Sequence, residues 1–521
     1  MILGDIIWRN AQLNGDREAI IFEGRRTTHR DFCKRVHRAA NALLMRGVRH
    51  QERVAVLARN CQEALEIFGA GEMTGFITVN INSRLSVKEV EDICQDAQPT
   101  VFIYEAEFAA AAEALQARLP CVGLFVLIDK DPSGTPAWAE SYESLLEGAP
   151  DTTPPLRADP EDVAYLIYTS GTTGKPKGVM FQQKAMVEAA RTLALEGAAR
   201  EPIKALIVMP LFHIGARIES LSFLLLGGCI VMHRVFDAER VLATIAAERI
   251  TAMHVAPIMV QRILEVDNRD EFDTSSLECV RYASAPMPVP LLTRAIKAFG
   301  PIFIQVYGMT ECLGGTTLKP HEHRIDGSPR EQRRLASAGQ PYLGTDLRIV
   351  RMDDSPANPG EIGEVLIRSP ATMKGYWNNT AATVETLRDG WMHTQDLGYV
   401  DEDGFLFIVD RKKDMILSGG ENIYSWEVEE ALRRHSSVAE VAVIAVPDEE
   451  WGEAVKACVV LHPGASADES GLITFCREQI ASYKKPRSID FVPELPRLFN
   501  GKVDKKALRA PHWTGRDRQV S

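Results

Sequence analysis

Short apolar runs that alternate with helical patterns are the feature that most restricts the fold of this chain. Residues 53–57 (Arg-Val-Ala-Val-Leu) form an apolar run typical of a buried strand, and residues 205–209, 229–232 and 280–283 have the same character. Between such runs apolar residues recur at helical spacing, as in residues 32–44. This repetition of strand, helix and strand predicts an α/β fold in which helices cover both faces of parallel sheets.

The pattern changes twice in the second half of the chain. Residues 347–351 and 364–368 resemble strands but lie among Gly and Pro, which predicts a small barrel-like subdomain, formed by an antiparallel barrel or a small sheet. After Asp410 a new succession of elements predicts a separate α+β domain of about 110 residues. Its expected elements are a helix over 427–435, strands over 441–446 and 457–461, a helix over 472–480 and a strand over 489–492.

Charge and cysteine content exclude several classes of protein. The 521 residues carry a formal net charge of −12, and all of it lies in residues 1–410 because residues 411–521 are electrically balanced. An acidic chain is a poor candidate for nucleic-acid binding, which requires a basic face. The nine cysteines are scattered without a C-x-x-C pair, which argues against a zinc site or disulfides and favours a reducing compartment.

The first residues and the longest apolar stretches predict a cytoplasmic protein without a transmembrane segment. An acid stands at position 5, and no basic segment followed by an apolar run precedes it, so no signal peptide is expected. Residues 221–232 are apolar but contain Gly227 and Gly228 and are too short to cross a bilayer.

Residues 168–178 have the sequence Tyr-Thr-Ser-Gly-Thr-Thr-Gly-Lys-Pro-Lys-Gly. They follow an apolar run over 163–167, so we expect a loop at the end of a strand. Glycines let the backbone wrap around a ligand, the hydroxyl groups add donors, and Lys175 and Lys177 add positive charge, a composition that suits a polyphosphate. The loop differs from a Walker A motif, which has four residues between its first glycine and Gly-Lys.

This string resembles the signature of the adenylate-forming superfamily, which contains acyl-CoA synthetases, luciferases and the adenylation domains of peptide synthetases. Residues 307–311 (Tyr-Gly-Met-Thr-Glu) resemble the second signature of that family. By this resemblance Glu311 would bind Mg²⁺, Thr310 would contact a nucleotide phosphate and Tyr307 would stack near the adenine. The similarity extends over residues 1–510.

Two further segments resemble parts of the family that bind the nucleoside. Residues 283–288 (Ala-Ser-Ala-Pro-Met-Pro) are similar to the adenine-side loop, with Ser284 and Ala285 where the family is richer in Gly. Asp396 is similar to the residue that binds both ribose hydroxyls, a task that suits a carboxylate because it accepts two hydrogen bonds. Gln395 stands where the family usually has Gly, so the backbone path at this position is left open.

The C-terminal part carries three more similarities. Residues 410–416 (Asp-Arg-Lys-Lys-Asp-Met-Ile) resemble the hinge between a large and a small domain, where Arg411 would contact the ribose and Lys413 would be the pivot. Residues 419–420 (Gly-Gly) resemble the pair that lines the pantetheine tunnel. Lys502, which follows Asn-Gly, resembles the lysine that reaches the α-phosphate and the carboxylate.

The resemblance implies a division into a large domain (1–409), a hinge (410–414) and a small mobile α+β cap (415–521). The implied catalytic residues are Thr169, His213, Glu311 and Lys502. The implied nucleotide- and CoA-binding residues are Ser170, Gly171, Thr172, Thr173, Gly174, Lys175, Lys177, Ser284, Ala285, Tyr307, Gly308, Thr310, Asp396, Arg411, Gly419 and Gly420.

The reaction implied by the resemblance is that of an ATP-dependent acyl-CoA synthetase. A carboxylate would attack the ATP α-phosphate and release pyrophosphate, and coenzyme A would then displace AMP from the acyl-AMP. The expected ligands are a carboxylic acid, ATP, Mg²⁺ and coenzyme A, and a homodimer is left open. Because ATP and CoA are polyanions, we expect positive charge around Lys175, Lys177, Arg411 and Lys502.

Residues 211–215 (Leu-Phe-His-Ile-Gly) resemble the aromatic gate of the family, with His213 beside the acyl carbon. Mostly apolar or small residues over 214–221 and 255–259 predict a slot for an uncharged organic tail. We expect a medium- or long-chain fatty acid first, and an aryl or arylalkenyl acid second. Arg217 is the exception, and it is expected either at the surface or in contact with a polar substituent of the acid.

The same motifs also occur in proteins that are not CoA ligases. An amino-acid substrate is not expected, because peptide-synthetase domains usually place an Asp near the gate, where this chain has Phe212, Ile214 and Gly215. A luciferase-type oxygenase uses much the same residues and stays an alternative. A nucleotide-binding sensor without catalysis is a further alternative, although a sensor could bind ATP without having all of Glu311, Asp396, Arg411 and Lys502.

Overall fold

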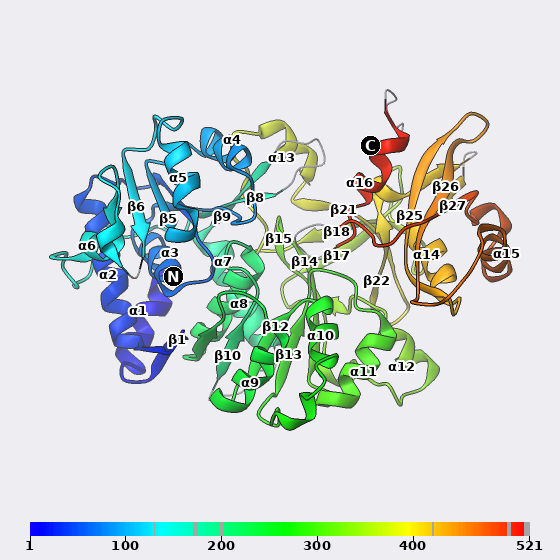
Figure 1. Cartoon of the computed structure of the whole chain (residues 1–521), viewed down its shortest axis with the longest axis horizontal. Coiled ribbons are helices and arrows are strands. Elements are labelled where there is room, and N and C mark those ends of the chain that lie inside the picture. The colour runs from blue at the N-terminus through cyan, green and yellow to red at the C-terminus, as the bar shows by residue number, and fades with distance from the viewer. Residues whose placement is uncertain (130, 170–175, 198–202, 419–420, 498–501, 515–521) are drawn as a thin grey trace. The chain divides into compact units, whose positions relative to one another are not determined.

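The computed structural model in Figure 1 describes residues 1–129, 131–169, 176–197, 203–418, 421–497 and 502–514. Packing divides the chain into two compact units, each discontinuous in sequence. The first unit comprises Met1–Asp346 and Ile367–Met392, and the second comprises Leu347–Leu366 and His393–Ser521. The hinge predicted at 410–414 lies within the second unit, and the predicted domain boundaries remain a prediction.

The first unit contains an eight-stranded sheet in the order β19-β9-β8-β4-β3-β5-β6-β7. Its strands are β3 (Arg53–Leu57), β4 (Ile77–Asn80), β5 (Val101–Glu105), β6 (Leu124–Ile128), β7 (Glu140–Ser141), β8 (Val163–Thr169), β9 (Lys177–Gln182) and β19 (Gly375–Tyr376). Strands β8 to β7 in this order are parallel, whereas β9 and β19 add antiparallel pairs at one edge.

A nine-stranded sheet in the same unit has the order β16-β15-β14-β13-β12-β10-β11-β1-β2. Its strands are β1 (Glu18–Phe22), β2 (Arg25–Thr28), β10 (Lys204–Ile207), β11 (Cys229–Met232), β12 (Ala252–Val255), β13 (Cys279–Tyr282), β14 (Phe303–Met309), β15 (Cys312–Leu318) and β16 (Gln340–Pro341). The strands from β14 to β1 are parallel, and both edges end in antiparallel pairs.

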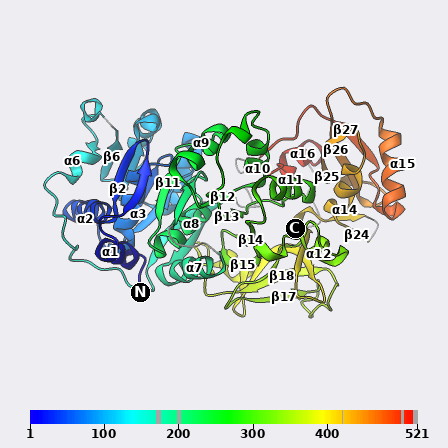
Figure 2. The ribbon, with the colours of Figure 1, turned by 90° about the horizontal axis from the view of Figure 1, so that it is seen from below.

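Helices cover both faces of the nine-stranded sheet. Figure 2 shows α9, α10 and α11 on one side of β11, β12 and β13, and α7 and α8 on the other. The helices of the first unit are α1 (Gly4–Leu13), α2 (His29–Met45), α3 (Gln62–Thr74), α4 (Val87–Ala97), α5 (Ala109–Gln116), α6 (Tyr142–Leu146), α7 (Gln183–Glu196), α8 (Ile214–Leu225), α9 (Ala238–Glu248), α10 (Pro257–Leu264), α11 (Val289–Phe299), α12 (Pro329–Arg334) and α13 (Thr380–Thr386).

The apolar runs recognised in the sequence form the central strands because a strand covered on both faces buries every side chain. Val54 to Leu57 on β3 and all of β11 are buried, and each sheet has its own apolar core. The predicted α/β fold with covered parallel sheets is therefore confirmed. The antiparallel edges were not anticipated, and they carry the segments described below as the candidate site.

A five-stranded sheet has the order β17-β18-β21-β20, with β22 paired to β21. Its strands are β17 (Asp346–Val350), β18 (Gly363–Arg368), β20 (Leu387–Arg388), β21 (Trp391–Val400) and β22 (Leu406–Arg411). Strand β21 pairs antiparallel with β22, and this pairing brings Asp396 opposite Arg411. A small sheet was expected in this region.

The remainder of the second unit is an α+β fold whose elements match those expected after Asp410. A sheet in the order β24-β23-β26-β25, with β27 paired to β26, packs with helices around its own apolar core. The elements are β23 (Ile416–Ser418), β24 (Glu421–Ile423), α14 (Ser425–Arg433), β25 (Val438–Asp448), β26 (Gly452–Leu461), α15 (Glu469–Gln479), β27 (Ser488–Phe491) and α16 (Lys505–Arg509). In the part of the chain that the structure describes, no helix combines the length and apolarity needed to cross a membrane.

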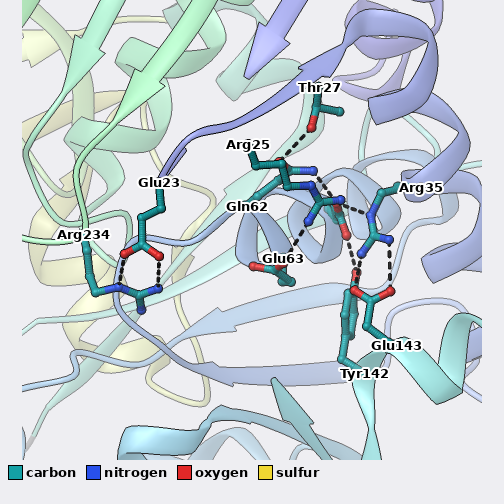
Figure 3. A network of polar contacts seen from close by, with 10 residues as sticks. Glu23, Arg25, Thr27, Arg35, Gln62, Glu63, Tyr142, Glu143 and Arg234 are labelled. Carbon is teal, nitrogen blue, oxygen red and sulfur yellow. Dashed lines mark hydrogen bonds and ion pairs between the residues drawn. The ribbon is translucent and has the colours of Figure 1, made fainter. Parts of the chain in front are cut away.

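A buried ionic network ties α2, α3 and α6 together in the first unit (Figure 3). The Glu66 side chain is fully buried and accepts hydrogen bonds from Arg35 at 2.6 Å, from Gln62 at 2.9 Å and from Tyr142 at 3.0 Å. Arg35 also pairs with Glu143 at 2.6 Å. A carboxylate without water needs such partners, and Arg35 is nearer to Glu66 than the second arginine, Arg25, which lies 4.0 Å away.

Replacing Arg35 by Met should therefore destabilise the protein by about 3 kcal/mol, because the substitution leaves the Glu66 charge buried with less compensation. Thermal and urea unfolding would measure the change. The double variant Arg35→Met/Glu66→Gln should recover most of the loss. Equal instability of the single and double variants would show that shape, rather than charge, sets the effect.

Candidate active site

The predicted phosphate loop connects two paired strands at the edge of the eight-stranded sheet. Thr169 is the last residue of β8 and pairs with Lys177, the first residue of β9. The strand predicted before this string is therefore confirmed, and its last residue is paired with the residue that begins the next strand. The predicted loop residues Ser170, Gly171, Thr172, Thr173, Gly174 and Lys175 lie outside the described residues.

Tyr376 connects the base of this loop to the predicted magnesium ligand. Its hydroxyl group donates a hydrogen bond to Glu311 Oε1 at 2.9 Å, and the Nζ atom of Lys177 lies 5.1 Å from the centre of its ring. Burial, and then the negative charge of Glu311, raise the pKa of Tyr376, so the hydroxyl group stays protonated and donates. Lys177 and Glu311, which belong to separate motifs, thus both contact Tyr376: Lys177 lies over its ring and Glu311 accepts from its hydroxyl group.

Backbone pairing fixes the position of Tyr376. Strand β19 pairs with β9 so that Tyr376 lies opposite Val179, and its amide donates to Thr383 Oγ1 at 2.8 Å. Three residues earlier, the Met373 amide donates to the carbonyl oxygen of Glu311 at 2.9 Å. Sequence reasoning missed Tyr376, because its Gly-Tyr-Trp segment carries no charged or nucleophilic group and only the strand pairing reveals its role.

The second signature forms a hairpin between β14 and β15. Met309 pairs with Cys312, so Thr310 and Glu311 are the two turn residues at its tip. Tyr307 and Gly308 lie on β14, and a Cβ atom at Gly315 would lie 2.3 Å from the carbonyl oxygen of Tyr307. The hairpin therefore requires glycine at this crossing, and its tip presents Glu311 half-buried beside Tyr376.

The predicted adenine-side loop follows β13. Ser284 is exposed and has a φ of 74°, a left-handed conformation that favours glycine. Ala285, which is next in the chain, is half-buried. The loop thus keeps a glycine-like backbone although it has serine where the family is richer in glycine.

The predicted ribose-binding residues lie together in the second unit. Arg411 Nε lies 2.9 Å from Asp396 Oδ1, and the Asp396 side chain is buried. Lys413 belongs to a short helical turn directly after Arg411. Lys502 lies close enough to Asp396, Arg411 and Lys413 for their charges to affect its protonation. Four residues predicted from three motifs therefore form one charged cluster.

The Lys502 ammonium group has an altered proton affinity in this cluster. Burial and then the positive charge of Arg411 lower the pKa of Lys502, the negative charge of Asp396 opposes them and the charge of Lys413 adds to the lowering, so that the pKa is about 8. Burial also lowers the pKa of Lys413. A lysine balanced in this way is able to change protonation state near neutral pH, which marks it as a candidate functional group.

Gln395 adopts the conformation usual for the glycine that it replaces. Its φ is 61°, and both its backbone amide and its side-chain amide donate to Glu364 Oε1 at 3.3 Å. Glu364 is buried and also pairs with Lys412 at 3.3 Å and with His393 at 3.5 Å. The backbone path that the sequence left open is therefore the glycine-like one.

The predicted hinge segment is attached to the C-terminal helix α16. Arg509 donates to Asp414 at 2.6 Å, and Lys505 donates to Ser425 Oγ, which itself donates to Asp410. Burial raises the pKa of Asp410, whereas the charges of Lys505 and Arg509 outweigh burial at Asp414 and lower its pKa. The residues on either side of the predicted pivot are thus fixed to the segment that follows Lys502.

The predicted tunnel residues Gly419 and Gly420 lie outside the described residues, whereas their flanks are defined. Ser418 and Glu421 pair across the antiparallel strands β23 and β24. The role of the glycine pair stays a prediction.

The predicted acyl gate lies where α8 begins. His213 is half-buried, its ring centre lies 4.7 Å from that of Phe212, and its carbonyl oxygen accepts from the amide of Ala216 in the first turn of α8. The expected surface position of Arg217 is wrong, and its contact with a polar substituent of the acid stays a prediction. Arg217 is buried, and its Nε atom donates to Glu72 at 3.1 Å and to Tyr165 at 2.8 Å, so its charge is neutralised inside the protein.

The arrangement around Glu311 suits a magnesium ion that is bound largely through a substrate. Within the described residues, no group of three or more His, Cys, Asp and Glu side chains has the geometry of a metal site. Mg²⁺ commonly takes one or two carboxylates together with substrate phosphates and water. Glu311, beside the end of the predicted phosphate loop, offers a carboxylate of this kind.

Comparison with known families decides the classification. The family described as "AMP-binding enzyme" matches residues 7–377, and the "AMP-binding enzyme C-terminal domain" matches residues 427–502. The chain belongs to the AMP-binding enzyme family. This AMP-binding enzyme is an AMP-forming acid–thiol ligase by class.

Relatives of this AMP-binding enzyme are similar over nearly their whole length. It is 36% identical to a feruloyl-CoA synthase of Amycolatopsis sp, covering 97% of this chain and 98% of that protein. It is also 36% identical to an indoleacetate–CoA ligase of Aromatoleum aromaticum, covering 98% of each. Identity to the long-chain-fatty-acid–CoA ligase FadD13 of Mycobacterium tuberculosis is 33%, covering 93% of each.

Solved structures share the fold. The amide bond synthetase McbA from Marinactinospora thermotolerans has a TM-score of 0.88 at 28% identity and covers 98% of this chain and 99% of that one. The o-succinylbenzoate CoA synthetase MenE from Bacillus subtilis, in complex with its acyl-adenylate intermediate, has a TM-score of 0.83 at 31% identity. That match covers 96% of this chain and 97% of the other.

If Glu311 binds the metal of ATP, Tyr376→Phe should lower kcat/KM for ATP about tenfold, because it removes a hydrogen bond to a charged group and keeps the ring over Lys177. Acid-dependent pyrophosphate release at varied ATP and fixed Mg²⁺ would measure this. Tyr104→Phe is the matched control, since the buried Tyr104 hydroxyl has no partner within the described residues. If kcat/KM for ATP is the same in the two variants, Tyr376 has no role in binding or using ATP.

If Lys502 acts as a cation, kcat/KM for ATP should fall as pH rises through about 8, because the lysine is protonated below this pKa and neutral above it. The profile of kcat/KM against pH from 6.5 to 9.5 would measure the decline. Lys502→Arg should move the decline to higher pH, since a guanidinium group stays charged there. A profile identical in both proteins would assign the decline to another group.

Proposed function

We propose that this chain is an ATP-dependent acid–CoA ligase that proceeds through an acyl-AMP. The observation that carries the proposal is the clustering of residues from separate motifs into two charged groups. One group joins Lys177 and Glu311 through Tyr376, and the other joins Asp396 and Arg411 near Lys502. The family assignment and the CoA ligases among its relatives support the same reaction.

In the first half-reaction, a carboxylate oxygen of the acid attacks the α-phosphorus of ATP. The bond between the α-phosphorus and the bridging oxygen breaks, and pyrophosphate leaves. Asp396 would hold the ribose hydroxyls, and Glu311 would hold a Mg²⁺ ion, which offsets phosphate charge when it is bound. The Lys502 ammonium group would stabilise the negative charge that gathers on the α-phosphate and carboxylate oxygens.

In the second half-reaction, the sulfur of coenzyme A attacks the acyl carbon. The carbon–oxygen bond to AMP breaks, AMP leaves, and the thiol proton passes to solvent. We expect Gly419 and Gly420 to line the path of the pantetheine arm and His213 to lie beside the acyl carbon. A rotation at Lys413 would exchange the groups that serve the two steps.

We propose an aryl or arylalkenyl acid as the first candidate substrate class. Of the three relatives above, the two at 36% identity are named for feruloyl and indoleacetate groups, and the fatty-acid ligase is at 33%. This order of identity supports an aryl or arylalkenyl acid, whereas the sequence alone led us to expect a fatty acid first. A medium- or long-chain fatty acid is the second candidate.

A panel of carboxylic acids tests the proposal. ATP–pyrophosphate exchange that depends on added acid would establish adenylation, and its absence with every acid would favour a nucleotide sensor. Loss of free CoA thiol with AMP formation would establish the ligase. An AMP-forming reaction that consumes an amine rather than CoA would instead indicate amide synthesis, as in the name of McbA.

A variant of Lys502 tests whether this residue acts in adenylation alone and not in thioester formation. Lys502→Ala should lose acid-dependent pyrophosphate release by at least about a hundredfold, because it removes the charge at the α-phosphate. The same variant should still form thioester from supplied acyl-AMP and CoA. Equal loss in both half-reactions would contradict a role restricted to adenylation, and Lys506→Ala, at an exposed position of α16, is the control.

A further inference from the structure

His254 has an unusual position in the interior of the first unit. It lies on β12, where it is registered with Ile207 of β10 and Arg281 of β13, so it belongs to the middle of the nine-stranded sheet. Its side chain is 4% exposed. Neither ring nitrogen has a hydrogen-bond partner among the described residues.

Buried histidines elsewhere in the described chain are better satisfied. His323 bonds to the Tyr282 hydroxyl at 3.1 Å and to the Lys319 carbonyl oxygen at 2.8 Å. His233 Nε2 bonds to Thr244 at 2.9 Å. Among the histidines that the structure describes, only His254 has two buried ring nitrogens that both lack a hydrogen-bond partner. A buried polar group left unpaired is costly, so the two nitrogens point to a ligand that completes them.

The charged groups near His254 are already paired with one another. Arg281 pairs with Glu219 and donates to Ser222 Oγ at 2.9 Å. Burial lowers the pKa of His254, the charge of Arg281 lowers it further and the charge of Glu219 opposes this. The ring is therefore neutral, with one nitrogen that donates and one that accepts.

Gly215 leaves space at the edge of this ring. A Cβ atom added to Gly215 would have one neighbouring atom within 4 Å, the Cε1 atom of His254 at 3.8 Å. Cε1 lies between the two ring nitrogens, so the polar edge of the imidazole faces Gly215. Gly215 is half-buried and follows the predicted gate residue His213 by two positions.

We propose that His254 is a specificity-determining residue that hydrogen-bonds a neutral polar group on the tail of the acid, such as a ring hydroxyl. A hydroxyl group both donates and accepts, which matches a neutral imidazole. Gly215 leaves room for the tail to reach the ring. This inference rests on the proposed function and adds to it a preference for hydroxylated acids over plain hydrocarbon ones.

The test compares cinnamic acid with its 2-, 3- and 4-hydroxy derivatives in the full-length protein. For the wild type we expect kcat/KM for at least one hydroxylated acid to exceed that for cinnamic acid by tenfold or more, since an unpaired polar site rejects a substrate that lacks the hydroxyl. In His254→Leu this ratio should fall to near one, mainly through KM for the hydroxylated acid. His254→Asn, which retains a donor and an acceptor, should keep part of the preference.

Equal kcat/KM for all four acids in the wild type would overturn the inference, as would a ratio unchanged in His254→Leu. If His254 has only a structural role, His254→Leu should lower kcat/KM for every acid by the same factor. That result would also contradict the inference. If His254→Leu does not fold, Gly215→Ala provides the decision. It should raise KM for the hydroxylated acid while KM for ATP stays constant, and an unchanged KM for the acid counts against the inference.

These outcomes are distinct from failure of the proposed function. A protein that releases pyrophosphate with several acids and shows no hydroxyl preference retains the ligase proposal and loses the role of His254. A protein that releases none with any acid loses both.

Discussion

Helix α8 is held from two sides by buried ion pairs, and the predicted acyl gate at its start depends on this constraint. Arg217 is paired with Glu72 of α3 and with Tyr165 of β8, whereas Glu219 is paired with Arg281 of β13. The helix is thereby fixed to elements of both large sheets. Residues two apart on a helix point to nearly opposite sides, so neither rotation nor a shift along the axis is free of cost.

The antiparallel edges of the parallel sheets carry the segments predicted to bind the nucleotide. The β8–β9 hairpin holds both ends of the predicted phosphate loop, and β19 adds Tyr376 beside it. The β14–β15 hairpin presents Glu311 at its turn. Short hairpins allow backbone groups and side chains to project beyond a covered sheet, which explains why these segments have polar or glycine-rich sequences.

The sequence was sufficient for the covered strands and for candidate charged residues that the structure brings together, and it was insufficient for residues whose contacts depend on a distant partner. Uninterrupted apolar runs such as residues 53–57 have no stable place outside a covered sheet, so they located strands. Arg217 was misjudged because its partner Glu72 is far away in the sequence, and local pattern cannot distinguish a paired interior arginine from an exposed one. Tyr376 was missed for the same reason, because its partner Glu311 lies in a distant segment of the chain.

The glutamine at position 395 has an evolutionary consequence. Its left-handed backbone costs about 1 kcal/mol relative to glycine, and its two hydrogen bonds to the buried Glu364 carboxylate offset that cost. Glycine and glutamine are then nearly equivalent solutions at this position, provided that the residue at 364 stays charged. Drift at the two positions is therefore coupled, and a chain that loses the carboxylate at 364 gains by returning to glycine at 395.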